Sequence, residues 1–173
     1  MKAIVAADLD WGIGYEGKLL ERIPDDMKLF KQLTFDHVIV MGRKTLESLP
    51  GGKPLEGRTN IVLSRDEKFT LGNEPGVILR RSVDDVLESL KKVHYTRDVF
   101  IIGGAEIYKE FLQYCDIIYV TKSQKRYTAD RFFKNLDIGR EFRLLTASDP
   151  YTHNGVGYNF LKYERLVEKK KIP

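Results

Sequence analysis

The sequence predicts an α/β fold: a three-layer sandwich whose central sheet is mostly parallel, has an antiparallel C-terminal edge, and carries helices on both faces. Two observations predict this architecture. Apolar runs of strand length alternate with segments of helical period between residues 3 and 121, which is typical of a parallel sheet. Residues 140–147 and 156–166 follow without a helical interval between them, which indicates a terminal antiparallel pair.

Six apolar runs are expected to form the other strands. They cover residues 3–7, 38–41, 59–64, 76–79, 99–102 and 117–121. The first helix should begin at Pro24, because proline fits the first turn and the acids Asp25 and Asp26 complement the helix dipole. Its residues Met27, Phe30 and Leu33 are spaced to face the core.

Three further helices are expected, after Gly42, after Ser82 and after Gly104. Ser82 and Asp85 resemble a capping box. The apolar face of the helix behind them comprises Val83, Val86, Leu87, Leu90 and Val93. Ile107, Phe111 and Leu112 are expected to point inward from the last helix.

Length and composition indicate one globular domain over residues 1–173, with a basic tail from about residue 167. Of the 173 residues, 42% are hydrophobic, which is enough to fill a core. Cys115 is the only cysteine, and the three histidines lack zinc-ligand spacing, so neither a disulfide scaffold nor a metal site is expected. No run approaches the ~20 apolar residues of a membrane span or resembles a signal peptide. We therefore expect a cytoplasmic, monomeric protein without membrane contact.

The net charge of +4 and the pI near 9.0 raise the possibility of a nucleic-acid-binding protein. Much of the excess charge lies in Lys169, Lys170 and Lys171, which a solvated terminus explains equally well. The sequence has no basic helix face and no basic stretch interleaved with aromatic residues. We therefore expect no nucleic-acid partner.

Residues 8–24 form a long glycine-punctuated segment, and loops of this length are usually functional. Because the segment is short of apolar anchors, Asp8 to Arg22 is expected to be a mobile lid without regular structure.

Glycines and cations follow three of the predicted strands. Gly103-Gly104 would let backbone amides approach a pyrophosphate, although such pairs are also common in turns. Arg43, Lys44 and Thr45 follow one strand, and Ser64 and Arg65 follow the next. Two strand ends that deliver cations to one edge indicate a site for a terminal phosphate, unless they are solvated surface charges. Together the three segments favour a dinucleotide that carries a 2′-phosphate.

Two charged residues are candidates for substrate chemistry. Asp26 precedes Phe30 by one helical turn, so its carboxylate should lie beside apolar groups, whereas Asp25 should point to solvent. A carboxyl in such surroundings has a raised pKa and can move a proton or hold a cationic heterocycle, although simple capping of the helix is the alternative. Arg58 follows Gly57 and either grips a carboxylate or closes a turn.

The motifs in this order resemble dihydrofolate reductase over residues 2–166. The matching segments are Pro24-Asp25-Asp26 with Phe30, residues 40–48 from Val40-Met41-Gly42-Arg43 onward, Gly57-Arg58-Thr59-Asn60, Ile101-Ile102-Gly103-Gly104-Ala105 with Tyr108, and Tyr158-Asn159-Phe160. The resemblance implies hydride transfer from NADPH to C6 of 7,8-dihydrofolate and protonation of N5, which yields 5,6,7,8-tetrahydrofolate.

The resemblance also implies site residues. Asp26 and Thr121 match the catalytic acid and its hydrogen-bonding companion. The substrate residues comprise these two together with Val5, Ala6, Met27, Phe30, Leu49, Leu55 and Arg58, of which Arg58 pairs with the glutamate α-carboxylate. The NADPH residues comprise Ala7, Ile13, Gly14, Leu19, Gly42, Arg43, Lys44, Thr45, Ser64, Arg65, Ile102, Gly103, Gly104, Ala105, Glu106, Ile107 and Tyr108.

The sequence departs from the family pattern at two places. Glu21 stands where the family has a tryptophan. Its carboxylate could act in the pocket in one of two ways: it would repel negative charge near the pterin carbonyl, or it would bind that carbonyl through a water molecule. The alternative is that it points outward. If it acts in the pocket, Glu21→Gln should lower the apparent pKa of hydride transfer. Ala129-Asp130-Arg131 stands where the family has Gly-Asp-Thr. The sequence therefore does not determine which contacts this loop makes with residues 8–24.

Other functions remain compatible with parts of the pattern. The related NADPH-dependent reductase of riboflavin biosynthesis is the alternative enzyme, although it would not need the Pro-x-Asp helix start or Arg58. A catalytically dead cofactor sensor is a further alternative, against which the presence of Asp26 argues.

Overall fold

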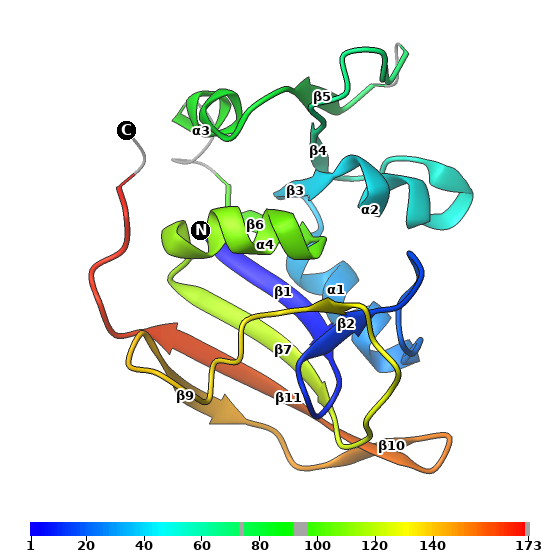
Figure 1. Ribbon diagram of the computed structural model, residues 1–173, viewed down its shortest axis with the longest axis vertical. Helices are drawn as coiled ribbons and strands as arrows, with labels where there is room; N and C mark the ends of the chain where they lie inside the picture. The colour runs from blue at the N-terminus through cyan, green and yellow to red at the C-terminus, as the bar shows by residue number, and fades with distance from the viewer. Residues whose placement is uncertain (73–74, 92–96, 172–173) are drawn as a thin grey trace.

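A central sheet organises the fold. The computed structural model describes residues 1–72, 75–91 and 97–171, and within them nine strands form the sheet. The parallel part runs β7 (Ile117–Ser123), β1 (Lys2–Ala7), β6 (Val99–Gly103), β3 (Val38–Gly42), β4 (Thr59–Leu63) and β5 (Val77–Arg80). Each lies within one or two residues of a predicted strand (Figure 1).

The antiparallel edge begins at β7. Strand β11 (Val156–Arg165) pairs antiparallel with β7, and both β9 (Phe142–Ala147) and β10 (Tyr151–His153) pair antiparallel with β11. The predicted terminal pair is therefore confirmed, with the short strand β10 added to it.

Helices cover both faces of the sheet, which confirms the three-layer arrangement. Strand residues alternate between two apolar clusters, because successive side chains of a strand point to opposite faces. One cluster includes residues of α3 (Val83–Lys91) and α4 (Ala105–Phe111). The other includes residues of α1 (Pro24–Thr34) and α2 (Arg43–Ser48). Short 3-10 turns follow at Pro50–Gly52 and Leu112–Tyr114.

Helix α1 begins at Pro24 as predicted, and its two acids differ in exposure. Asp26 is buried whereas Asp25 is exposed, and Phe30 and Leu33 pack against the apolar cluster on this face. The prediction for Met27 was wrong, because its side chain is 41% exposed. Met27 lies one position beyond Asp26, so it projects past the buried stripe of the helix.

Helix α3 has the predicted capping box. The Asp85 amide donates to Ser82 Oγ at 3.1 Å, and the Ser82 amide donates to Asp85 Oδ2 at 3.1 Å. Val86, Leu87 and Leu90 are buried, whereas Val93 lies outside the described residues. In α4, Ile107 and Phe111 point inward as predicted, and so does Leu112 just beyond it.

The segment after β1 is anchored, contrary to the prediction of an irregular segment that is short of apolar anchors. It contains β2 (Gly12–Gly14), which pairs antiparallel with β8 (Arg131–Phe132). Trp11 is 3% exposed and stacks on Phe133 at 6.1 Å between ring centroids. Asp130 keeps contact with the segment, because its amide donates to the Gly14 carbonyl at 3.0 Å. Residues 8–14 therefore belong to the folded body.

The basic tail is largely exposed, with Lys170 and Lys171 open to solvent, but part of it contacts the segment between α4 and β7. Lys169 Nζ donates to Asp116 Oδ2 at 2.6 Å, and the Lys170 amide donates to the Gln113 carbonyl at 3.0 Å. None of the helices in the described residues is long and apolar enough to cross a membrane.

Candidate active site

The candidate site lies where the carboxyl ends of the parallel strands meet. Register places Ala6 of β1 beside Thr121 of β7, Met41 of β3 beside Gly103 of β6, and Gly42 beside Leu63 of β4. Ligands of α/β proteins bind beyond this end of the strands. The sheet therefore brings the predicted phosphate-binding segments and the predicted acid to one edge.

Asp26 is a buried carboxylate held by a single hydroxyl. Its side chain is 6% exposed, and Thr121 Oγ1 donates to Oδ1 at 2.5 Å. Burial raises the pKa of Asp26, and the Thr121 hydrogen bond opposes that rise. No described residue donates to Oδ2. Asp26 is therefore an oriented acid with one oxygen left for a ligand.

Several predicted substrate residues belong to the face of the sheet that α1 covers. Phe30, Leu49 and Leu55 pack partly buried against the cluster that includes Ile4 and Met41. The exposed Met27 stands at the rim. Val5 differs from the expectation, because its side chain belongs to the cluster on the opposite face of the sheet. Alternation along β1 causes this placement and leaves only the backbone of Val5 facing the site.

Arg58 is a half-buried cation supported by neutral groups. Its Nε donates to Thr34 Oγ1 at 2.9 Å, and Nη1 donates to the Glu56 carbonyl at 2.6 Å. The Phe30 and Phe35 rings both lie near it, with each ring centroid 5.9 Å from the guanidinium carbon. No carboxylate of the described residues pairs with it, and burial lowers its pKa. The geometry favours gripping an incoming carboxylate over merely closing a turn.

Gly57 makes this arrangement possible. Its φ is +69°, and a Cβ there would lie 2.4 Å from the Phe35 ring. Any other residue would therefore displace Phe35 from beside the guanidinium.

The predicted phosphate-binding cations gather at the ends of β3 and β4. Arg43 opens α2, donates to Glu47 Oε1 at 3.0 Å and lies over the Phe69 ring at 5.6 Å. Ser64 is buried at the end of β4, whereas Lys44 and Arg65 are exposed. Because β3 and β4 are parallel neighbours, both cation-bearing ends face the same side. The sequence-based expectation that they share one edge is confirmed.

The glycine pair forms the middle of this edge. Gly103 has a φ of +105°, and a Cβ there would lie 2.8 Å from the Tyr108 ring. Tyr108 is fixed below it, since its hydroxyl donates to the Ile4 carbonyl at 2.7 Å. A Cβ on Gly104 would meet Thr45 Oγ1 at 3.5 Å, so α2 and α4 begin close together. Position 103 therefore requires glycine, because of its positive φ and because of the Tyr108 ring.

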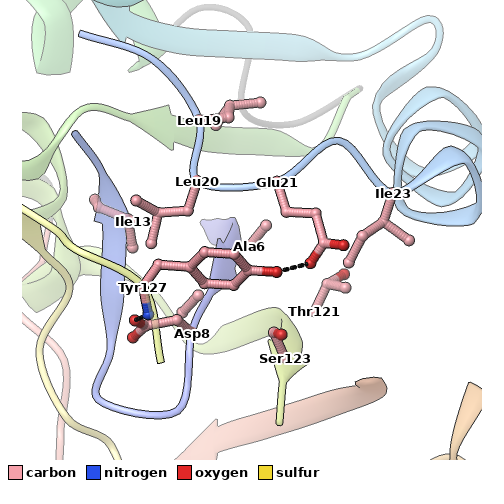
Figure 2. A pocket seen from close by; sticks show the side chains of 11 residues that line it. Ala6, Asp8, Ile13, Leu19, Leu20, Glu21, Ile23, Thr121, Ser123 and Tyr127 are labelled. Atoms are coloured by element: carbon pink, nitrogen blue, oxygen red, sulfur yellow. Dashed lines mark hydrogen bonds between the residues drawn. The ribbon is translucent and has the colours of Figure 1, made fainter. Parts of the chain in front are cut away.

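A small pocket that is open to solvent lies beside Thr121, the hydrogen-bond partner of Asp26 (Figure 2). Its lining comprises Ala6, Ala7, Asp8, Ile13, Leu19, Leu20, Glu21, Ile23, Thr121, Ser123 and Tyr127. Glu21 turns into it and accepts a hydrogen bond from the Tyr127 hydroxyl at 2.5 Å. The alternative in which Glu21 points outward was therefore wrong. Tyr127 was missed from the sequence because no local pattern marks its partner 106 residues away.

The described residues contain no group of side chains that could bind a metal ion. Among residues 1–72, 75–91 and 97–171, no cluster of His, Cys, Asp or Glu side chains is arranged to hold a metal ion.

Comparison with known proteins decides the family. The family model described as dihydrofolate reductase matches residues 1–165. The chain belongs to the dihydrofolate reductase family. A dihydrofolate reductase of Staphylococcus aureus is 37% identical over 133 residues, which cover 77% of each chain.

Longer proteins and a solved structure agree with this membership. The bifunctional dihydrofolate reductase-thymidylate synthase of Glycine max is 38% identical over 95% of this chain, but the chain spans about a third of that protein, 33% of its length. A dihydrofolate reductase structure from Enterococcus faecalis, complexed with NADP(H) and RAB-propyl, has a TM-score of 0.80 and 30% identity. The alignment covers 96% of both chains, so the dihydrofolate reductase fold extends over nearly the whole chain.

Proposed function

We propose that the protein reduces 7,8-dihydrofolate to 5,6,7,8-tetrahydrofolate with NADPH. The observation that carries the proposal is the buried Asp26 carboxyl, oriented by Thr121 at the sheet edge that also presents the glycines and cations. Family membership supports the same activity.

The cofactor side fits NADPH in shape and charge. Gly103 and Gly104 would present backbone without side chains against which a pyrophosphate can lie. Arg43, Lys44 and Arg65 would hold the 2′-phosphate, because their strands end side by side. Ala7, Ile13 and Leu19 line the pocket where the nicotinamide would lie. When bound, NADPH supplies the hydride that C6 of the substrate accepts.

Asp26 is the residue that would assist protonation of the substrate. Burial favours its neutral form, so Asp26 retains a proton at a higher pH than an exposed aspartate does. Thr121 fixes Oδ1, which would leave Oδ2 for the ligand. Asp26 would thereby bind the donor edge of the pterin and favour the protonated N5 that the transfer of hydride to C6 requires.

The far end of the substrate would meet Arg58. Its guanidinium is already oriented by Thr34, the Lys31 carbonyl and the Glu56 carbonyl. Preorganisation of this kind lowers the entropic cost of binding a carboxylate. Phe30, Leu49 and Leu55 would enclose the rings between the two charged ends.

We further propose that the chain acts as a single-domain cytoplasmic monomer with no nucleic-acid partner. The cations at the ends of β3 and β4 are accounted for by the 2′-phosphate, and Lys169 is engaged by Asp116. Size-exclusion chromatography with light scattering tests the monomer, and a filter-binding assay at about 150 mM salt tests nucleic-acid affinity.

The activity is tested by following NADPH oxidation at the nicotinamide absorbance. We expect oxidation when dihydrofolate is added, and little when the ribosylated pyrimidine substrate of riboflavin biosynthesis is added instead. Turnover of the pyrimidine but not of dihydrofolate would overturn the proposal.

A further inference from the structure

Glu21 and Tyr127 join two distant segments across the pocket. Glu21 comes from the segment between β2 and α1, and Tyr127 from the loop after β7 (Figure 2). The Tyr127 hydroxyl donates to Glu21 Oε2 at 2.5 Å. Both side chains line the pocket beside Thr121, whose hydroxyl holds Asp26. The pair therefore borders the space next to the catalytic acid.

Tyr127 is held in place by the folded body. Its backbone amide donates to Asp8 Oδ2 at 2.9 Å, while Asp8 Oδ1 accepts from the Gly12 amide at 2.7 Å. Burial and the nearby Glu21 raise the pKa of Tyr127 to about 12, so the phenol remains a donor at neutral pH. A fixed donor of this kind sets where the Glu21 carboxylate lies.

The second oxygen of Glu21 is left for a ligand. A carboxylate accepts hydrogen bonds through both oxygens, and no described residue donates to Glu21 Oε1. Asp8, the other acid of the pocket, already accepts hydrogen bonds from the backbone amides of Asp10, Gly12 and Tyr127. The lining residues include no lysine, arginine or histidine from the described chain. A half-buried carboxylate without a cation favours a ligand that brings its own donor.

We propose that Glu21 is a specificity-determining residue that accepts a hydrogen bond from an N–H donor of the bound heterocycle, directly or through one water, and that Tyr127 is its positioning residue. The Glu21 carboxylate thus selects donor-rich heterocycles in the pocket that Thr121, the hydrogen-bond partner of Asp26, also lines. This inference rests on the proposed function, since dihydrofolate is the heterocycle in question.

The test measures dissociation constants of dihydrofolate and, separately, of NADPH by titration calorimetry. The variants are Glu21→Gln, Tyr127→Phe and the double variant. Glu16→Gln and Tyr15→Phe are matched controls, because both residues are exposed in the same segment and neither lines the pocket. Thermal unfolding of each variant reports whether the fold is intact.

We expect Glu21→Gln and Tyr127→Phe each to weaken dihydrofolate binding about 10-fold, the effect of losing a charge-assisted hydrogen bond. NADPH binding and both controls should stay within about twofold. If Tyr127 acts through Glu21, the double variant should bind no more than about twofold more weakly than Glu21→Gln, because coupled residues are not additive.

Three results would count against the inference. A Glu21→Gln variant that binds dihydrofolate as tightly as the parent overturns the role of Glu21. Fully additive effects in the double variant overturn the positioning role of Tyr127. A parent protein that binds NADPH but not dihydrofolate overturns the proposed function and, with it, this inference.

Discussion

Arg58 shows how a single residue can be prepared for a ligand by neutral partners. Its guanidinium donates to Thr34 Oγ1 and to the carbonyls of Lys31 and Glu56, and two aromatic rings lie close to it. The sequence left its role open, because Thr34 is 24 residues away and no local pattern connects the two. The burial of Asp26, by contrast, could be predicted, because helical periodicity places Asp26 beside the apolar face of the helix and Asp25 toward solvent.

Replacing Arg58 with glutamine should weaken binding of substrates that carry a glutamate carboxylate. A hydrogen bond to a charged group contributes roughly 1.5–3 kcal/mol, so we expect KM for dihydrofolate to rise about 10- to 150-fold. Dihydropteroate, which lacks the glutamate, is the matched control, and its KM should change little. Equal losses for the two substrates would show that Arg58 shapes the site without binding the carboxylate.

At the scale of elements, the carboxyl ends of the parallel strands bring together the residues proposed to bind the cofactor. The parallel strands and their trailing glycines and cations could be predicted, because apolar runs and glycine pairs are local signals. Strand β2 was missed, because it is three residues long and pairs with β8 from the far end of the chain. The anchoring of Trp11 was missed for the same reason, since Phe133 and Tyr163 contact it from distant segments.

Removing the cations from both strand ends should erode the preference for NADPH over NADH. In the variant Arg43→Gln/Arg65→Gln we expect NADPH binding to weaken about 10- to 150-fold for each arginine replaced, with NADH affinity almost unchanged. Arg140→Gln is the control, because Arg140 is exposed outside the strand ends. The two dissociation constants are measured by titration. A parent protein that uses both cofactors equally would refute this placement of the 2′-phosphate.

On the scale of the whole molecule, Asp116 ties the end of the described chain to its start. Lys169 Nζ donates to Asp116 Oδ2 at 2.6 Å, and the Met1 ammonium lies 3.3 Å from the same oxygen. Burial alone would raise the pKa of Asp116, but Lys169 and the Met1 ammonium together lower it. The carboxylate therefore stabilises the fold above its unfolded pKa of 3.8, and this stabilisation is lost as pH falls through the lower folded value.

Asp116→Asn should consequently lower the free energy of unfolding at pH 7. Because the Asp116 side chain is 45% exposed, solvent screens the pair and we expect a loss of at most about 1 kcal/mol. Urea denaturation should show that the difference from the parent shrinks as pH falls below 3.8, and that salt reduces it at pH 7. A difference that persists unchanged in acid would contradict an ionic origin.

Asp26 carries the central claim, and Asp26→Asn tests it most directly. The change keeps the shape of the side chain and removes its proton. We expect the turnover of dihydrofolate at pH 7 to fall roughly 10²- to 10⁴-fold, with partial recovery as pH falls and substrate arrives protonated. The raised pKa of Asp26 means that its ionised form destabilises the fold above that pKa, so the variant should unfold at a higher temperature than the parent at pH 7. The decisive measurement is the pH–rate profile of NADPH oxidation for parent and variant: a deep loss at pH 7 that narrows in acid supports the account, and a variant within a few-fold of the parent at pH 7 contradicts it.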